Sequence, residues 1–207
     1  MALAFEELFS IPDAFRGIPM PGRTDAMILS DAADKHGIAR DASDLARFPD
    51  IYLSHLAREL EKPGPRKGVM PGVRALLDAL LACDDMYLAL LTGNYEAAAR
   101  VKLQYFDLWR YFPCGAFGDA APDRTALLAK AVARVVACGG PRVDRPDRIV
   151  IIGDTPLDVA CAAAGGARAI MVATGSYGVG DLRAAGADLV FEDLSNTADV
   201  IAAIRKI

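Results

Sequence analysis

From Gly72 onward the sequence alternates between short apolar runs and amphipathic segments, and this alternation is its strongest constraint on the fold. Five apolar runs predict strands, at 86–94, 112–118, 148–154, 167–175 and 187–193. Segments with helical spacing separate and flank them, at 72–82, 96–106, 124–137, 156–166, 181–186 and 197–206. Strands joined by helices predict an α/β fold with a parallel sheet covered on both faces. In such sheets ligands bind at the carboxyl ends of the strands.

The part of the chain that precedes this alternation carries only helical signals. Its first residues, "MALAFEELF", form an apolar cluster that indicates a first helix. A second helix is expected after a cap at Thr24 or Asp25, with a stop at Gly37. A third has apolar residues near helical spacing and is expected to begin or kink at Pro49.

A Pro- and Gly-rich stretch, "KPGPRKGVMPG", separates the two parts and is typical of a linker. We therefore expect a small helical domain over residues 1–66 and an α/β domain over residues 67–207.

The overall composition excludes several classes of protein. The chain of 207 residues has a net charge of −4 and no block of like charges, which is atypical of a nucleic-acid-binding protein. No apolar run approaches the roughly 20 residues that cross a bilayer, and the start lacks a signal-peptide pattern. We expect a cytoplasmic protein, as a monomer or a homodimer, that binds neither nucleic acid nor membrane. The four cysteines form no C-x-x-C pair, so we expect buried, reduced thiols rather than a zinc site.

Two polar motifs follow predicted strands. In the first, "LLTGN", the hydroxyl of Thr92 and the backbone N–H groups after it could hold a phosphate. The alternative is that Thr92 only caps the next helix.

In the second motif, "GDTPLD", Asp154 and Asp158 form an oxygen-rich pair suited to Mg²⁺ together with substrate phosphate and water. Pro156 fits the first turn of the following helix. The alternative is that both acids only stabilise the helix N-terminus.

These motifs, with "IVIIGDTPLD" and "GARAIMVATGSY", resemble the haloacid dehalogenase superfamily near its phosphoglycolate-phosphatase-like members. The segment "GIPMPGRTD" and the helices around it resemble the helical cap of that group, and "VMPGVRALLDAL" resembles the return from cap to core. The resemblance covers nearly the whole chain. It implies a Rossmannoid parallel-sheet core with a small all-helical cap, from which the first core strand is missing.

The resemblance also implies roles for the polar residues. Thr92, with the backbone of Gly93 and Asn94, would bind the transferring phosphoryl group. Lys102 would neutralise its charge, and Arg124 in "PDRTALL" is the alternative cation, because many relatives place their lysine after the next strand.

The same resemblance implies residues for metal binding and for contacts between the cap and the substrate. Asp154 would bind Mg²⁺, with Asp158 supporting the metal directly or through another ligand. Arg23 in "GRTD" is a candidate contact to an anionic substrate, or simply an exposed loop arginine. We expect Thr92 and Asp154 to lie in one shared pocket.

The nucleophilic motif of that superfamily, "DxDGT" at the end of the first strand, does not occur in this sequence. Asp13 stands alone, Asp31 and Asp34 lie in a helical pattern, and the pair at 84–85 precedes a strand instead of ending one. We expect that Met1 is an internal methionine and that a strand with the motif belongs upstream; the alternative is a natural degenerate member. Without that strand, a gap is expected between the strands that end at Thr92 and Asp154.

The function that this pattern favours is Mg²⁺-dependent hydrolysis of a small, phosphoglycolate-like phosphomonoester through an aspartyl-phosphate, beneath a cap that excludes water. A dehalogenase activity fits the sequence less well, because the dehalogenase branch of the superfamily does not need the metal pocket that Asp154 and Asp158 would form. The alternative from another class is a catalytically inactive protein that binds phosphate or a partner.

Overall fold

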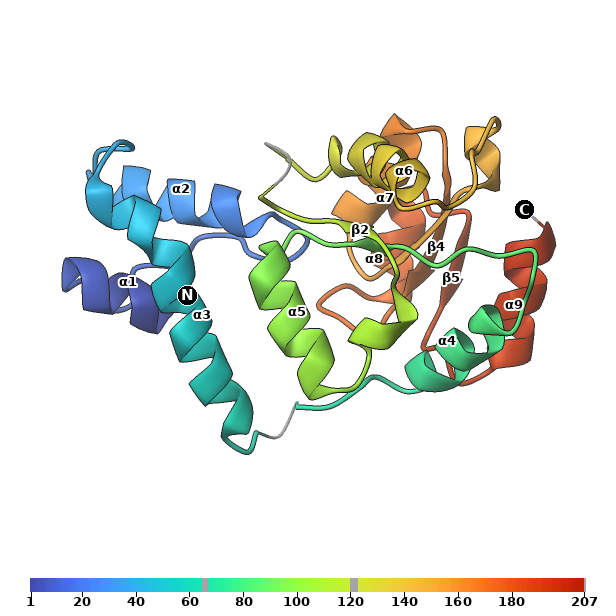
Figure 1. Cartoon of the computed structure of the whole chain (residues 1–207), viewed down its shortest axis with the longest axis horizontal. Helices are drawn as coiled ribbons and strands as arrows, with labels where there is room; N and C mark the ends of the chain where they lie inside the picture. Colours follow the sequence, from blue (N-terminus) through green and yellow to red (C-terminus); the bar gives the residue numbers. More distant parts are fainter. Residues whose placement is uncertain (65–66, 120–122, 207) are drawn as a thin grey trace.

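The computed structural model describes residues 1–64, 67–119 and 123–206. The three N-terminal helices gather on one side of the molecule, and the strands with the later helices lie on the other (Figure 1). Helix α5 (Glu96–Tyr105) stands between these two groups and contacts α3. The expected boundary at residue 66 and the last core residue, 207, lie outside the described residues.

The N-terminal helices are α1 (Ala2–Phe9), α2 (Asp25–Lys35) and α3 (Ser43–Glu61). Their apolar faces share one hydrophobic cluster, in which Phe5 and Phe48 are fully buried. Ala98 of α5 completes the same cluster. The helices therefore pack through a core of their own, to which α5 of the α/β part contributes Ala98.

The observed ends of these helices can be compared with the capping residues expected from the sequence. Thr24 caps α2, as one of the two expected alternatives, with the Met27 N–H donating to its Oγ1 at 3.2 Å. Helix α2 ends at Lys35, and Gly37 follows with a φ of 67°. Of the two alternatives for Pro49, a helix start there is wrong, because α3 starts six residues earlier, at Ser43, and includes the proline. Burial of the flanking Phe48 and Tyr52 against the cluster outweighs the hydrogen bond that a proline forfeits.

All strand pairs are parallel, as the alternating sequence predicts. In one sheet Leu90 pairs with Gly115, and in the other Ile152 pairs with Ile170 and Met171 with Val190. The strands are β1 (Leu90–Leu91), β2 (Gly115–Ala116), β3 (Val150–Gly153), β4 (Arg168–Val172) and β5 (Leu189–Phe191).

The two sheets, with orders β1-β2 and β3-β4-β5, are not joined. In the described part of the chain no strand lies between β1 and β3, which confirms the expected gap between the strands before Thr92 and Asp154. Leu91 of β1 nevertheless packs against the same hydrophobic cluster as Ile151 of β3. The two sheets therefore share one core layer although their facing edges form no backbone hydrogen bonds.

The helices of the α/β part cover this layer. Helices α6 and α7 contact β2 and β3 respectively, whereas α4 and α9 pack on each other. Across the described ranges, none of the helices has the length and hydropathy needed to span a membrane. The remaining helices are α4 (Val73–Leu81), α6 (Leu127–Ala137), α7 (Pro156–Ala164), α8 (Val179–Ala184), α9 (Thr197–Lys206) and the 3₁₀ turns η1 (Trp109–Tyr111) and η2 (Pro146–Arg148).

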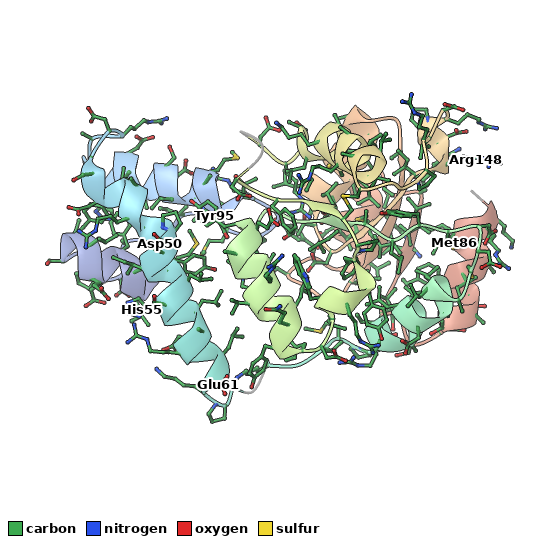
Figure 2. The ribbon with its side chains drawn as sticks, viewed as in Figure 1. Asp50, His55, Glu61, Met86, Tyr95 and Arg148 are labelled. Carbon is green, nitrogen blue, oxygen red and sulfur yellow. A yellow bond between two sulfur atoms is a disulfide. The ribbon has the colours of Figure 1, made fainter. Side chains whose placement is uncertain are left out.

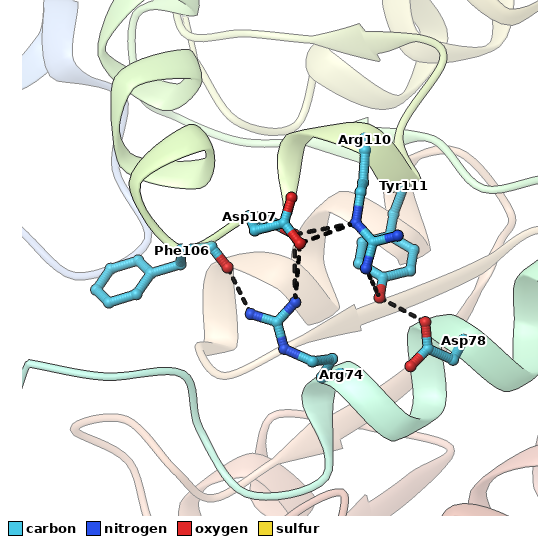
Figure 3. A network of polar contacts seen from close by, with 6 residues as sticks. All are labelled: Arg74, Asp78, Phe106, Asp107, Arg110 and Tyr111. Atoms are coloured by element: carbon cyan, nitrogen blue, oxygen red, sulfur yellow. Dashed lines mark hydrogen bonds and ion pairs between the residues drawn. The ribbon is translucent and has the colours of Figure 1, made fainter.

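A polar network fixes the C-terminal end of α5 against α4 (Figure 3). Arg74 of α4 donates to the Phe106 carbonyl at 2.5 Å, and its guanidinium lies 3.6 Å from the Asp107 carboxylate. The hydroxyl of the fully buried Tyr111 donates to Asp78 at 2.5 Å. The network holds in place the helix that carries Lys102.

The expectation that all four cysteines are reduced is wrong for two of them. Cys114, beside β2, and Cys138, which caps the end of α6, form a disulfide, whereas Cys83 and Cys161 are free. The two cysteines are 24 residues apart, and neither spacing nor composition pairs them. They meet because α6 packs back across β2.

We expect replacement of both bridging cysteines by serine to lower the free energy of unfolding by about 3 kcal/mol, because the disulfide closes a loop of this length in the unfolded chain. Urea denaturation with and without a reductant measures the effect. The matched control is Cys83→Ser, which leaves the disulfide intact. Equal stability of the double variant and the control would show that the bridge does not form in solution.

Candidate phosphate-binding site

The predicted anion-binding residues converge on one pocket. It has a volume of about 400 Å³ and lies where the N-terminal helices meet the end of β1. Six of the residues singled out in the sequence line it, namely Arg23, Thr92, Gly93, Asn94, Lys102 and Arg124. The structure thus brings together side chains that are up to 101 positions apart, from Arg23 to Arg124.

The turn after β1 leaves an N–H group free in this pocket. The Asn94 N–H donates to Thr92 Oγ1 at 3.2 Å, so the hydroxyl organises the turn. The following helix is capped at Tyr95 without a side-chain cap, so Thr92 is not its cap. Among the residues that the structure describes, the Gly93 N–H has no hydrogen-bond partner. A free N–H and a hydroxyl at a strand end are the donors that a phosphate oxygen accepts.

Glycine is required here by close backbone contacts. A Cβ at Gly93 would collide with the Arg23 carbonyl oxygen, and one at Gly118 would collide with the Gly93 carbonyl oxygen. The loop before α2 and the loop after β2 therefore press on the turn from two sides. This packing fixes the direction in which the Gly93 N–H points.

Asp25 locks this turn to the N-terminal helices. It is only 3% exposed, its N–H donates to the Gly93 carbonyl at 2.7 Å, and its carboxylate accepts from Asn94 Nδ2 at 3.2 Å and the Tyr95 N–H at 2.9 Å. Figure 2 shows Tyr95 where α5 meets the N-terminal helices. Sequence reasoning identified Asp25 only as a possible cap, because an acid in the first turn of a helix is typical of capping alone.

Lys102 reaches the pocket through the same network. Its Nζ donates to Asn94 Oδ1 at 3.0 Å, so Asn94 links the ammonium group to Asp25. Burial lowers the pKa of Lys102 from its ordinary 10.5, and the nearby Asp25 carboxylate partly offsets this. No carboxylate in the described ranges lies within ion-pair distance of Lys102.

Both arginines of the pocket are already paired. The Arg23 guanidinium lies 2.6 Å from Asp31 and also donates to the Pro19 carbonyl. Arg124 Nε donates to Asp158 Oδ1 at 2.9 Å, and its Nη2 binds the same oxygen. Of these three cationic side chains, Lys102 therefore has the least compensated charge.

Asp154 lies elsewhere, which corrects the expectation of one pocket shared with Thr92. It lines a second hollow of about 180 Å³, with Val73, Val172 and Leu194 among its walls. The physical reason is the gap between the sheets, since β1 and β3 belong to separate sheets and are not hydrogen-bonded neighbours. Burial, and then the negative charge of Asp158, raise the pKa of Asp154.

Asp154 and Asp158 differ in their ability to bind a metal ion. Both oxygens of Asp158 are occupied, Oδ1 by Arg124 and Oδ2 by Thr155 and the Asp154 N–H, and the side chain is 1% exposed. It forms a capping box with Thr155, followed by Pro156 at the first position of α7, as the capping alternative predicts. The Asp154 carboxylate accepts no hydrogen bond from another described side chain, so it is open to a cation. The described residues contain no cluster of three metal-ligating side chains.

Comparison with known proteins places the chain in a family. It is 30% identical over 186 residues to a protein named phosphoglycolate phosphatase from Rhodospirillum rubrum, covering 87% of this chain and 73% of that protein. The chain belongs to the haloacid dehalogenase superfamily. It is a member of that superfamily's phosphoglycolate-phosphatase-like hydrolases, and the HAD-hydrolase-like family model matches residues 122–197.

Two further relatives match over smaller parts of their length. A phosphoglycolate phosphatase from Chromobacterium violaceum is 30% identical over 74% of this chain and 63% of its own. A thiamine-phosphate synthase from Bordetella avium is 41% identical over 55% of this chain and 50% of its own. The chain thus spans between half and three quarters of these relatives.

Solved structures of similar chains confirm the fold. A hydrolase from Pseudomonas syringae superposes with a TM-score of 0.69 at 19% identity, covering 98% of this chain and 90% of that one. A predicted phosphoglycolate phosphatase from Haemophilus somnus superposes with a TM-score of 0.68 at 16% identity, covering 97% and 88%. The superfamily fold therefore extends over the whole described chain.

Replacing Asp25 by asparagine should destabilise the protein by about 1–3 kcal/mol, because an amide would place an N–H group against the buried Asn94 or Tyr95 donors. Chemical denaturation measures this change. Asp34→Asn is the matched control on the same helix; its exposed pair with Arg40 is worth about 0–1 kcal/mol. If both variants unfold at the same denaturant concentration, Asp25 does not lock the turn.

Proposed function

We propose that the 400 Å³ pocket binds the phosphoryl group of a small phosphomonoester and is the phosphate subsite of a hydrolase. The observation that supports this most is that Thr92, Gly93, Asn94 and Lys102 line one pocket, in which Lys102 donates to Asn94. The names of the relatives make phosphoglycolate the first substrate to consider. Binding between the N-terminal helices and the strand end also fits a helical cap over residues 1–66.

Each residue of the turn has a separate task in this proposal. The Gly93 N–H and the Thr92 hydroxyl bind phosphoryl oxygens. Lys102 neutralises their charge, and it is favoured over Arg124 because Asp158 already neutralises the arginine. Asn94 orients the ammonium group, and Asp25 orients Asn94.

A magnesium ion would be held by Asp154, which has the only unengaged carboxylate of the "GDTPLD" motif within the described structure. Mg²⁺ is commonly held by one or two carboxylates together with substrate oxygens and water. When bound, the ion would supply positive charge to the second hollow, which Arg124 and Asp158 link to the phosphate pocket. Asp158 would act only indirectly, by holding the Asp154 backbone and Arg124.

Hydrolysis through an aspartyl-phosphate needs an unengaged carboxylate beside the phosphorus atom. The described pocket has none, because both oxygens of its one carboxylate, Asp25, accept hydrogen bonds from the turn. We therefore propose that residues 1–207 bind phosphate without turning a phosphomonoester over. Binding, rather than turnover, is the informative measurement on this chain.

Lys102→Met should weaken the binding of inorganic phosphate at least tenfold, because it removes the cationic side chain of the pocket that has no ion-pair partner among the described residues. For the unchanged protein, binding should weaken as pH rises through the lowered pKa of Lys102, since the ammonium group then loses its proton. Isothermal titration at a series of pH values measures both effects. Lys130→Met, at an exposed lysine of α6, is the control. Undiminished binding by Lys102→Met would refute the proposed subsite.

Asp154→Asn should abolish the binding of Mn²⁺, used as a probe for Mg²⁺, because the amide removes the negative charge that holds a hard cation. Electron paramagnetic resonance of free Mn²⁺ measures the bound fraction. Asp147→Asn is the control, since Asp147 precedes the same strand at its opposite end. Equal Mn²⁺ binding by the two variants would place the metal elsewhere.

A further inference from the structure

The walls of the pocket differ in chemistry from its phosphate end. We propose that the organic group of the substrate is apolar, in contrast to the carboxylate-bearing group of phosphoglycolate. This inference rests on the proposed phosphate subsite and narrows its substrate class.

The wall opposite the turn comes from the N-terminal helices and is formed by apolar and aromatic side chains. Phe15 precedes α2, Ile28 lies on α2 and Tyr52 on α3, and all three line the pocket while remaining less than 9% exposed. Met20 also lines it and is 40% exposed, so it lies at the solvent side of this wall. An organic group bound against these side chains would exchange water for apolar contacts.

Among the described side chains of the pocket, Lys102 is the one cation without an ion-pair partner. The guanidinium of Arg23 is neutralised by Asp31, and that of Arg124 by Asp158. Lys102 is needed for the phosphoryl group. The remaining charged side chain is the carboxylate of Asp25, which would repel a carboxylate on the substrate. The other ionisable group of the lining is the α-amine of Met1, and burial lowers the pKa of this amine from its ordinary 8.0.

The aromatic wall is uncharged as well. Burial, together with the negative charge of Asp25, raises the pKa of Tyr52 far above its ordinary value, so its phenol remains neutral.

Small-molecule pockets typically occupy about 300–1,000 Å³. The volume of about 400 Å³ lies within that range and leaves room for an organic group beside the phosphoryl group.

The experiment compares three probes that share a phosphoryl group: methyl phosphate, phenyl phosphate and phosphoglycolate. Their dissociation constants are measured with residues 1–207 by titration calorimetry or nuclear magnetic resonance. Phenyl phosphate should bind about tenfold more tightly than methyl phosphate, because binding removes the apolar surface of its ring from water. Phosphoglycolate should bind no more tightly than methyl phosphate.

Variants at Met20 test whether this preference comes from the pocket wall. Met20→Gln should reduce the advantage of phenyl phosphate, and Met20→Lys should also strengthen phosphoglycolate binding by supplying a cation. The control is Met70→Gln, at a methionine of similar exposure, 45%, that lines the second hollow instead. Met70→Gln should leave the dissociation constants of all three probes unchanged.

The outcomes separate this inference from the function on which it rests. If the three probes bind and Lys102→Met weakens them all, the phosphate subsite stands. Phosphoglycolate binding as tightly as phenyl phosphate then overturns the apolar assignment alone. If none of the probes binds in a manner that depends on Lys102, the phosphate subsite is wrong and the apolar assignment is overturned with it.

Discussion

The carboxylate of Asp25 joins the N-terminal helices to the turn that ends β1, and the geometry of the pocket depends on it. Its two oxygens accept from Asn94 and Tyr95, while its own N–H donates to Gly93. A carboxylate that is 3% exposed is stable only when its hydrogen bonds are satisfied, so the N-terminal helices and the turn have to move together. The same bonds orient Asn94, which in turn holds Lys102.

The gap between β1 and β3 is the second constraint on the site. In a continuous parallel sheet the carboxyl ends of neighbouring strands meet in one crevice. Here the turn at Thr92 and the acid at 154 follow strands of separate sheets, and they line separate hollows. Arg124 spans the distance between them, because it lines the first hollow and binds Asp158 one helical turn after Asp154.

Much of the fold, and the part of the site that lies at strand ends, could be predicted from the sequence because both depend on local patterns. Strand ends, the Thr92–Gly93–Asn94 turn and the capping residue Thr24 each have a signature within a few residues. The role of Asp25 could not be predicted, because its partners are 69 and 70 positions away and an acid in a first turn has an ordinary explanation. The Cys114–Cys138 bridge was missed for the same reason.

The sequence by itself determined the parallel α/β architecture, the helical N-terminal part and the polar residues at the strand ends, since periodicity and capping act over short distances along the chain. Tertiary structure alone decided which charges remain available. It paired Arg23 with Asp31 and Arg124 with Asp158, and left Lys102 without a carboxylate partner in the described structure. A charge is neutralised by whatever lies within a few ångströms of it, and that proximity is set by packing between distant segments.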